Sequence, residues 1–324
     1  MKTPVLNEMY WLVKREFWEH RGGFLWAPVI TGGVFLLLNL MGIIAGEVIG
    51  AQHGMHFMFN DQIHLLDHTL SADDAARAGA LMDMVMYSTS FIISIVLGFV
   101  VFFYCLGALY DDRRDRSLLF WKSLPLSDSA TVLSKVVAGT VLAPVIAMIC
   151  GVITGIGMLL LFVIALSFHG VGAWHLLVYA HPFRVVANLV GTIPLYALWA
   201  LPSTGWLLLC SAWARSKPFL WAAVLPLAVG MMLGWFNLLG TRVVGSGWYW
   251  GDVCGRILLS VFPGSWLGAG NYQNVSSGTE HALDALNLGN AYGVMTTPSF
   301  WIGAVAGLAL LAGAIWFRRW RDDA

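Results

Sequence analysis

Six stretches of this chain are long and apolar enough to cross a lipid bilayer. A membrane-spanning helix needs roughly 20 mainly apolar residues, and such windows cover approximately residues 24–46, 84–110, 131–167, 185–212, 219–240 and 300–317. Only 11% of the residues are charged, whereas soluble domains carry about 25%. The sequence therefore predicts an all-α integral membrane protein with six transmembrane helices, forming one transmembrane domain over residues 1–324.

Two features predict departures from straight spans. The third window is longer than a single crossing needs, so we expect its first turns to stand at the membrane surface. Prolines within the apolar windows remove a helical hydrogen bond and favour kinks. These prolines are Pro144, Pro194, Pro202 and Pro226.

The distribution of Lys and Arg predicts the orientation of the helices. If both termini are cytoplasmic, fourteen of the 18 Lys and Arg residues fall on the cytoplasmic side, and the outer side holds only Arg77, Arg184, Arg242 and Arg256. Cytoplasmic loops generally carry such an excess of positive residues. The even number of spans agrees with this bias, so we expect cytoplasmic termini.

Residues 1–23 are expected to form an interfacial helix ahead of the first span. Apolar residues recur there at helical spacing, at Leu6, Met9, Tyr10, Val13 and Phe17. The charged residues between Glu8 and Glu19 fall mostly on other faces, as in helices that lie in the headgroup region. Such a helix can be a fixed anchor or an elbow that slides along the membrane, and we prefer the anchor.

The first outer segment contains four of the nine histidines. His64 and His68 have the i, i+4 spacing of a helical metal site. However, the H-E-x-x-H motif is absent, and His and Asp are ordinary residues of a solvated acidic loop. We therefore expect no metal ligand in this chain and keep His64 and His68 as the alternative.

The last outer segment, residues 241–299, is expected to be a large loop. It is rich in Gly, Asn, Ser and Trp, and it contains the apolar run Ile257–Phe262 followed by Pro263 and Gly264. This run is too short to cross a bilayer. We expect a re-entrant or surface-lying hairpin there, because irregular backbone is tolerated at membrane depth only where protein or water satisfies it.

Several classes of function are disfavoured by what the sequence lacks. No ionisable residue lies at the centre of a predicted span, although ion-coupled transporters generally place such residues there. The nucleotide motif G-x-x-x-x-G-K-[ST] and the nucleophile motif G-x-S-x-G are also absent. We therefore expect that the chain is not an enzyme, holds no cofactor, and takes any energy it needs from a partner.

The longest charged segment between two spans is the most informative part of the sequence. Residues 111–127 follow the second span, and Asp111–Phe120 can form a short helix with an apolar tip at residues 118–121, closed by Pro125. Ser127 is a suitable N-cap for the third span, and Asp128 complements its dipole. Arginines around aromatic residues can anchor a protein partner, but they equally suit an interfacial helix on anionic lipid.

A resemblance distinguishes these two interpretations. The segment reads D-D-R-R-D-R-S-L-L-F-W-K-S-L-P-L-S-D and is followed by T-V-L-S-K. This run resembles the inner-loop signature of permease subunits of the ABC-2 type exporter family, with mild departures at Asp112 and Leu126. The resemblance implies a cytoplasmic coupling helix, between helices 2 and 3, that docks on an ATP-binding subunit. It assigns that contact to Arg113, Arg114, Arg116, Ser117, Phe120, Trp121, Lys122, Ser123, Leu124, Pro125, Ser127 and Asp128.

The resemblance also implies an assembly. It consists of two permease subunits and two copies of the ATP-binding subunit, in a bacterial inner membrane, with ATP and Mg on the partner and no nucleic acid involved. Substrate would pass between the two permease halves, beside the second and fifth spans, under a lid made by the last outer loop. The spans without central charge favour an amphipathic cargo. The alternative is a metal- or haem-binding redox or maturation subunit that uses the outer histidines.

Overall fold

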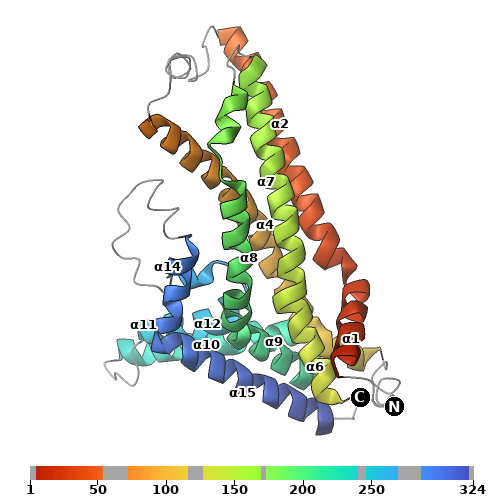
Figure 1. Ribbon diagram of the computed structural model, residues 1–324. Coiled ribbons are helices and arrows are strands. Elements are labelled where there is room, and N and C mark those ends of the chain that lie inside the picture. The colour runs from red at the N-terminus through yellow and green to blue at the C-terminus, as the bar shows by residue number, and fades with distance from the viewer. Residues whose placement is uncertain are drawn as a thin grey trace.

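The computed structural model describes residues 5–53, 72–115, 127–168, 173–239, 246–268 and 286–320. All regular elements in these ranges are helical (Figure 1). The long helices are α1 (Val5–Glu19), α2 (Ala27–His53), α4 (Ala72–Arg114), α6 (Asp128–Val137), α7 (Ala143–Phe168), α8 (Pro182–Trp199), α9 (Leu201–Trp213), α10 (Pro218–Leu238) and α15 (Pro298–Trp320).

Shorter elements complete the described chain. Three are π-helical turns, η1 (Gly22–Trp26), η2 (Ala138–Leu142) and η4 (Tyr249–Gly255). The others are η3 (Ala173–Val178), α11 (Ser246–Trp248), α12 (Arg256–Leu259), η5 (Ser265–Gly268), α14 (Leu288–Tyr292) and η7 (Gly293–Thr296).

Five helical stretches are long and apolar enough to cross a membrane, and a sixth appears if a bent pair counts as one. The five are Gly22–Ile49, Arg77–Arg114, Asp128–Phe168, Pro218–Leu238 and Pro298–Trp320. They correspond to five of the windows expected from the sequence. The prediction of an all-helical, multi-pass protein is therefore confirmed by length and composition.

The fourth expected span, residues 185–212, is not straight. It consists of α8 and α9, which meet at an angle of 50° at Ala200. Pro202 explains the break, because proline has no N–H to donate to the carbonyl of Leu198 and its ring crowds the preceding turn. The other internal prolines of the spans, Pro194 and Pro226, lie inside continuous helices.

The third span runs continuously from Asp128 to Phe168. It widens into the π-helical turn η2 just before Pro144. Proline at this position cannot donate to the carbonyl of Thr140, and a π-turn is a common way to accommodate a lost helical hydrogen bond. The expected perturbation at Pro144 is therefore a local widening of the helix.

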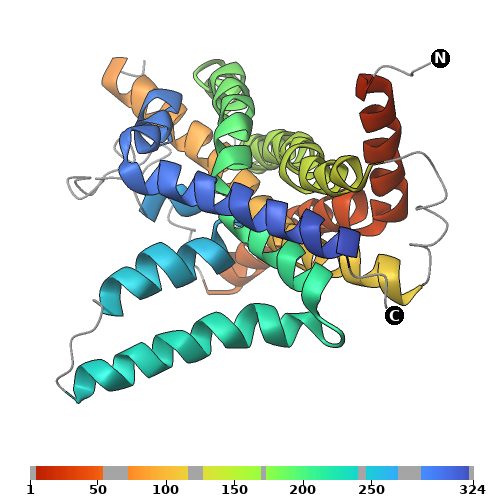
Figure 2. The ribbon, with the colours of Figure 1, turned by 90° about the horizontal axis from the view of Figure 1, so that it is seen from below.

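The helices form two groups that meet along α4. In Figure 1, α2 and α7 rise through the upper part of the molecule and α8 stands beside α7 at mid-height, whereas α9, α10 and α15 lie across the lower part. The view from below shows α15 against α9, with α10 at the margin (Figure 2). Helix α4 packs on both α7 and α9. Its buried residues Leu97, Val101 and Cys105 lie in one core with Leu207 and Ala304.

The hairpin expected after α10 stays a prediction, because the structure describes this segment only over residues 246–268, as short helical elements that reach and just pass a turn at Gly264. We call these residues the hairpin. Elements η4 and α12 lead into a turn at Gly264, whose φ of 86° suits glycine. Phe262, just before this turn, packs edge-on against Phe99 of α4 with ring centroids 5.0 Å apart. The hydroxyl of Tyr196 on α8 donates to the carbonyl of Val261 at 2.7 Å. The hairpin is thus fixed to both α4 and α8.

Helices α9 and α15 approach closely through glycine. A Cβ added to Gly205 would lie 2.6 Å from the carbonyl oxygen of Gly307, and one added to Gly307 would lie 2.7 Å from the nitrogen of Pro202. Small residues allow such close backbone contact between membrane helices. The contact therefore leaves no room for a larger side chain at either position.

We predict that Gly307→Val lowers the melting temperature of the protein in mild detergent. Overpacking of this kind costs about 1–3 kcal/mol. Gly234→Val on α10 is the matched control, because nothing lies within 4 Å of a Cβ at that position. Equal melting temperatures for the two variants, measured by a thermal unfolding assay, would contradict the close α9–α15 contact.

Candidate coupling site

The structure describes both ends of the expected coupling segment. Arg113 and Arg114 form the last turn of α4, which continues past Tyr110 as part of one long helix, and Ser127 and Asp128 begin α6. The remaining predicted contact residues lie outside the described residues. These are Arg116, Ser117, Phe120, Trp121, Lys122, Ser123, Leu124 and Pro125; the metal candidates His64 and His68 also lie outside.

The start of α6 is capped as the sequence predicts. The Ser127 side chain accepts a hydrogen bond from the backbone N–H of Ala130 at 3.1 Å, and Asp128 occupies the first turn. An N-cap hydroxyl satisfies a donor that the helix leaves unpaired, and a carboxylate there complements the positive end of the helix dipole. The prediction for Ser127 and Asp128 as helix-starting residues is confirmed.

One arginine joins the two ends of the segment. Arg318, near the end of α15, pairs through Nη1 with Asp112 Oδ2 at 3.3 Å and through Nε with Asp128 Oδ1 at 3.1 Å. Only 4% of its side chain is exposed. Because Asp112 precedes residues 116–126 and Asp128 follows them, this guanidinium fixes both ends of the segment to the end of α15.

A buried lysine extends the contacts to the N-terminal helix. Lys135 of α6 pairs with Asp112 Oδ2 at 3.4 Å and with Glu16 Oε1 of α1 at 3.1 Å. The Lys135 and Glu16 side chains are each only 1% exposed. The hydroxyl of Tyr104 on α4 donates to Glu16 Oε2 at 2.8 Å. We call Glu16, Asp112, Asp128, Lys135 and Arg318 the helix-end charge cluster.

The burial of Glu16 corrects the expectation for α1. The sequence placed the charged residues between Glu8 and Glu19 mostly away from the apolar face, yet Glu16 is buried, as is Leu12. Lys135 and Tyr104 supply the partners that make this burial tolerable. Trp11 and Trp18, by contrast, are exposed, as an interfacial helix requires.

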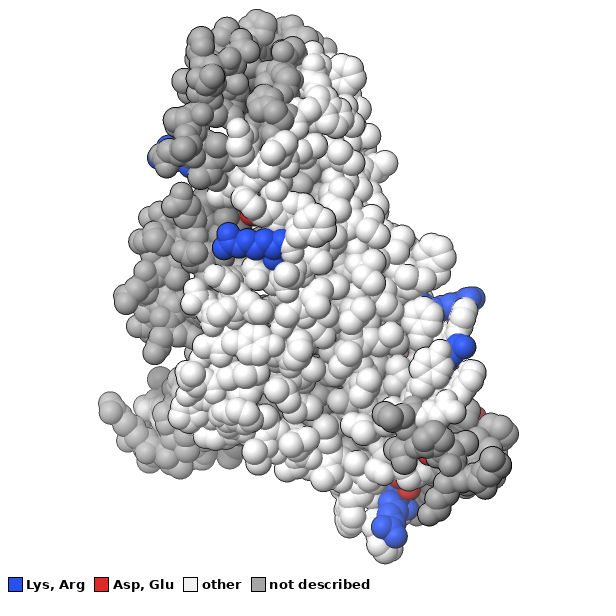
Figure 3. Space-filling view, viewed as in Figure 1, with Lys and Arg blue, Asp and Glu red and all other residues white. Residues whose placement is uncertain are grey.

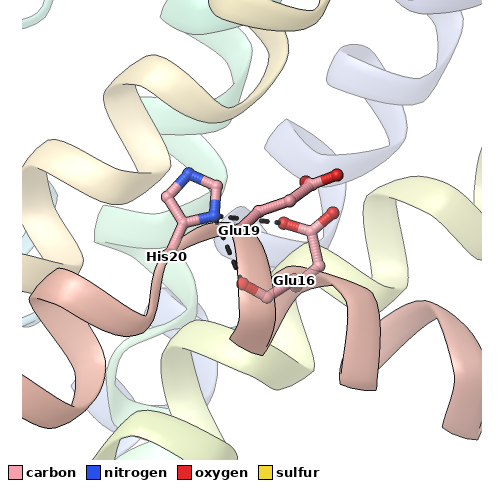
Figure 4. Close-up of side chains that lie close together, drawn as sticks. All are labelled: Glu16, Glu19 and His20. Atoms are coloured by element: carbon pink, nitrogen blue, oxygen red, sulfur yellow. Dashed lines mark hydrogen bonds and ion pairs between the residues drawn. The ribbon is translucent and has the colours of Figure 1, made fainter.

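Two further groups surround Glu16 on α1. Arg15 pairs with Glu16 Oε1 at 2.9 Å and with Glu19 Oε1 at 3.0 Å. The ring of His20 lies beside Glu16, with Nδ1 3.3 Å from its carbonyl oxygen (Figure 4). Glu16, Glu19 and His20 are close enough to share one metal ion. A cation there would, however, compete with Lys135 and Arg15 for the same carboxylate, so the contacts are better described as ion pairs.

Arg113 connects the same region to α9. Its Nη2 donates to the carbonyl oxygens of Ser211 at 2.6 Å and Ala214 at 2.9 Å, at the C-terminal end of α9. The Ser211 hydroxyl accepts in return from the backbone N–H groups of Leu109 and Tyr110. A cation at a helix C-terminus satisfies carbonyls that have no partner within the helix. The last turn of α4 is therefore joined to α9 as well as to α1, α6 and α15.

The cluster fixes geometry more than it adds stability. Removing two charges from water costs several kcal/mol each, which their attraction roughly offsets. Removing only one partner leaves the other charge buried, which costs about 3–5 kcal/mol. Asp112 also lies near the negative end of the α4 dipole, so it depends on Lys135 and Arg318 for compensation. The five side chains therefore favour one arrangement of four helix ends.

The surface of the molecule also carries its charged residues in separate zones. Most of the face in Figure 3 is uncharged, with Lys and Arg atoms at the lower right, where α1, α6 and the end of α15 lie in Figure 1, and a further group at mid-height on the left. An uncharged band between charged zones is what a lipid-facing surface requires.

A second buried charge lies where α8 and α9 meet. Arg256 of α12 is 7% exposed, and its guanidinium lies 3.6 Å from the ring centroid of Trp199. Burial lowers the pKa of Arg256 to about 10, an effect that nearby Asp252 opposes. The glycine at position 303 leaves the space that this guanidinium fills. Sequence reasoning counted Arg256 only as an outer charge, and no local pattern indicated its burial.

Comparison with known proteins adds no family assignment. No protein-family model, curated protein or solved structure matches this chain. The resemblance of residues 111–135 to ABC-2 permeases therefore stays a prediction.

We predict that Lys135→Met strongly destabilises the protein, because the buried Glu16 would keep only Arg15, and Asp112 only Arg318, as a cationic partner. The expected loss is about 3–5 kcal/mol of unfolding free energy. Lys14→Met is the control, since Lys14 is an exposed lysine of α1 that lies 4.8 Å from the Trp11 ring. The measurement is unfolding of the detergent-solubilised protein, and similar stability of the two variants would show that the cluster is not formed.

Proposed function

We propose that this chain is the permease subunit of an ATP-driven ABC exporter, and that residues 113–128 couple it to a separate ATP-binding subunit. The observation that carries the proposal is the bridge from Arg318 to Asp112 and Asp128. Together with Lys135 and Arg113, it joins both ends of the segment to α1, α9 and α15. A displacement of the segment would therefore move helices of both groups.

Such a connection is what coupling requires physically. ATP binding on a partner can shift the permease between two states only if the partner interacts differently with each. A segment attached flexibly at one end would absorb the displacement locally. A segment whose two ends are bridged by one buried guanidinium transmits it to α4, α6 and α15 together. This supports the coupling proposal, with the aromatic residues Phe120 and Trp121 as docking anchors.

The first test is isolation of the partner. We expect the tagged chain, solubilised in mild detergent from its native membrane, to retain a stoichiometric ATP-binding-cassette subunit, identified by mass spectrometry. Phe120→Ala combined with Trp121→Ala should release it, because large aromatic anchors dominate interface energies. Trp18→Ala, which changes an exposed tryptophan of α1, should not. A chain that purifies alone, or with bound metal or haem, would overturn the proposal.

Substitution of the bridging Arg318 should have a different effect from substitution of the docking residues Phe120 and Trp121. We expect Arg318→Gln to keep the partner bound and hydrolysing ATP while transport into inverted vesicles falls, because docking is intact but the segment is no longer fixed to α15. Arg319→Gln on the neighbouring exposed position is the control. Transport by Arg318→Gln at the control's rate would show that the bridge is not part of the coupling path.

A further inference from the structure

A cavity of about 270 Å³ lies between α4, α8 and the hairpin, away from the helix-end charge cluster. The α4 residues that line it all precede residue 95. Its walls are residues 84–94 of α4, residues 188–192 of α8, the hairpin turn at Pro263–Leu267, and Leu286 with Ala291. The size is near the lower limit of ligand pockets. No lining residue is charged, and the exposed wall is almost wholly apolar.

The walls are held in place by contacts around the cavity. On one side Asp83 of α4 accepts a hydrogen bond from the backbone N–H of His181 at 2.8 Å. On another side Trp199 of α8 donates through Nε1 to the hydroxyl of Ser265 in the hairpin, at 2.9 Å. The first contact joins α4 to the N-cap residue of α8, and the second joins α8 to the hairpin. The cavity is therefore a preformed space rather than a gap between independent helices.

Few polar groups in the walls remain available to a ligand. The hydroxyls of Ser88, Ser94 and Thr192 donate to carbonyls of their own helices. The Tyr87 hydroxyl accepts from Asn188 Nδ2 at 2.8 Å, and its own proton has no acceptor among the described residues. Ser90, which is 5% exposed, likewise has a buried hydroxyl without a partner in the described chain. A ligand would thus meet an apolar space with two hydroxyl donors in its walls, those of Tyr87 and Ser90.

The mouth of the cavity opens on an apolar surface. Phe91 lines the cavity and is also 52% exposed, and Val190, beside the lining residue Leu189, is 45% exposed. Arg184 lies one helical turn before Asn188 on α8, close enough to Tyr87 to act on it electrostatically. An apolar space, a hydroxyl donor and a cation therefore follow one another toward the start of α8.

We propose that this cavity binds one acyl chain of a bilayer glycerophospholipid, with an ester carbonyl accepting from the Tyr87 hydroxyl and the phosphate near Arg184. The order of groups along the lipid matches the order along the protein. The acyl chain fills the uncharged walls, the ester meets the free donor, and the phosphate meets the positive side chain. The site would hold a resident lipid between α4, α8 and the hairpin, whatever the chain transports.

The test uses vesicles of palmitoyl-oleoyl-phosphatidylethanolamine that contain a trace of the same lipid with a diazirine in one acyl chain. After illumination, mass spectrometry of the reconstituted chain should locate the label on residues 84–94 and 188–192. Leu189→Trp should reduce that labelling about tenfold or more, because the indole would fill part of the cavity and the acyl chain of the lipid would lose the burial of several methylene groups. Val190→Trp, the adjacent exposed position, should leave it unchanged.

Milder variants separate the polar contacts from the packing. Tyr87→Phe should weaken labelling about threefold to tenfold through loss of one hydrogen bond. Arg184→Gln should remove the preference for the phospholipid over a diacylglycerol that carries the same diazirine chain, and inorganic phosphate should not compete. Label spread evenly along α2 and α10, or equal labelling of Leu189→Trp and Val190→Trp, would overturn the proposal. None of these measurements needs a partner subunit, so their failure would leave the proposed function standing.

Discussion

Lys135 and Arg318 hold the ends of four helices together. Between them they contact Glu16, Asp112 and Asp128, which come from α1, α4 and α6. Each helix could bury its apolar surface against lipid, because hydrocarbon tails are as apolar as the side chains of another helix. Buried charges, in contrast, can be satisfied only by specific partners. The cluster therefore specifies which helix ends meet, whereas apolar packing and small residues determine how closely they pack.

The charge cluster and the bend at Ala200 divide the molecule into parts with different roles. At one end, ion pairs and the Arg113 contacts join α1, α4, α6, α9 and α15. At the middle, Pro202 breaks the α8–α9 span by 50° and allows the hairpin to pack between α4 and α8. Beyond the break, uncharged walls enclose the cavity proposed to hold lipid. Displacement at the charged end would thus reach the cavity through α4, which contributes to both.

Local features of the chain were predictable, and long-range ones were not. Apolar length gave five spans, and Ser127 was recognised as an N-cap because its spacing to the following helix is a local property. Glu16 and Lys135 are 119 residues apart, and no periodicity relates them. The sequence pattern assigned Glu16 to a polar face, although its buried position depends on partners from other helices. The orientation in the membrane and the docking role of residues 116–126 remain predictions.

The most direct test of this account is a double-mutant cycle on Asp112 and Arg318. The free energy of unfolding in mixed detergent would be measured for the native chain, Asp112→Asn, Arg318→Gln and the double variant. Residues that share one buried ion pair should show a coupling energy of about 0.5–3 kcal/mol. We predict a value in that range, so that the double variant loses less unfolding free energy than the two single variants lose in sum. Additive losses would mean that α4 and α15 are not joined by this pair, and would contradict the central role of the charge cluster.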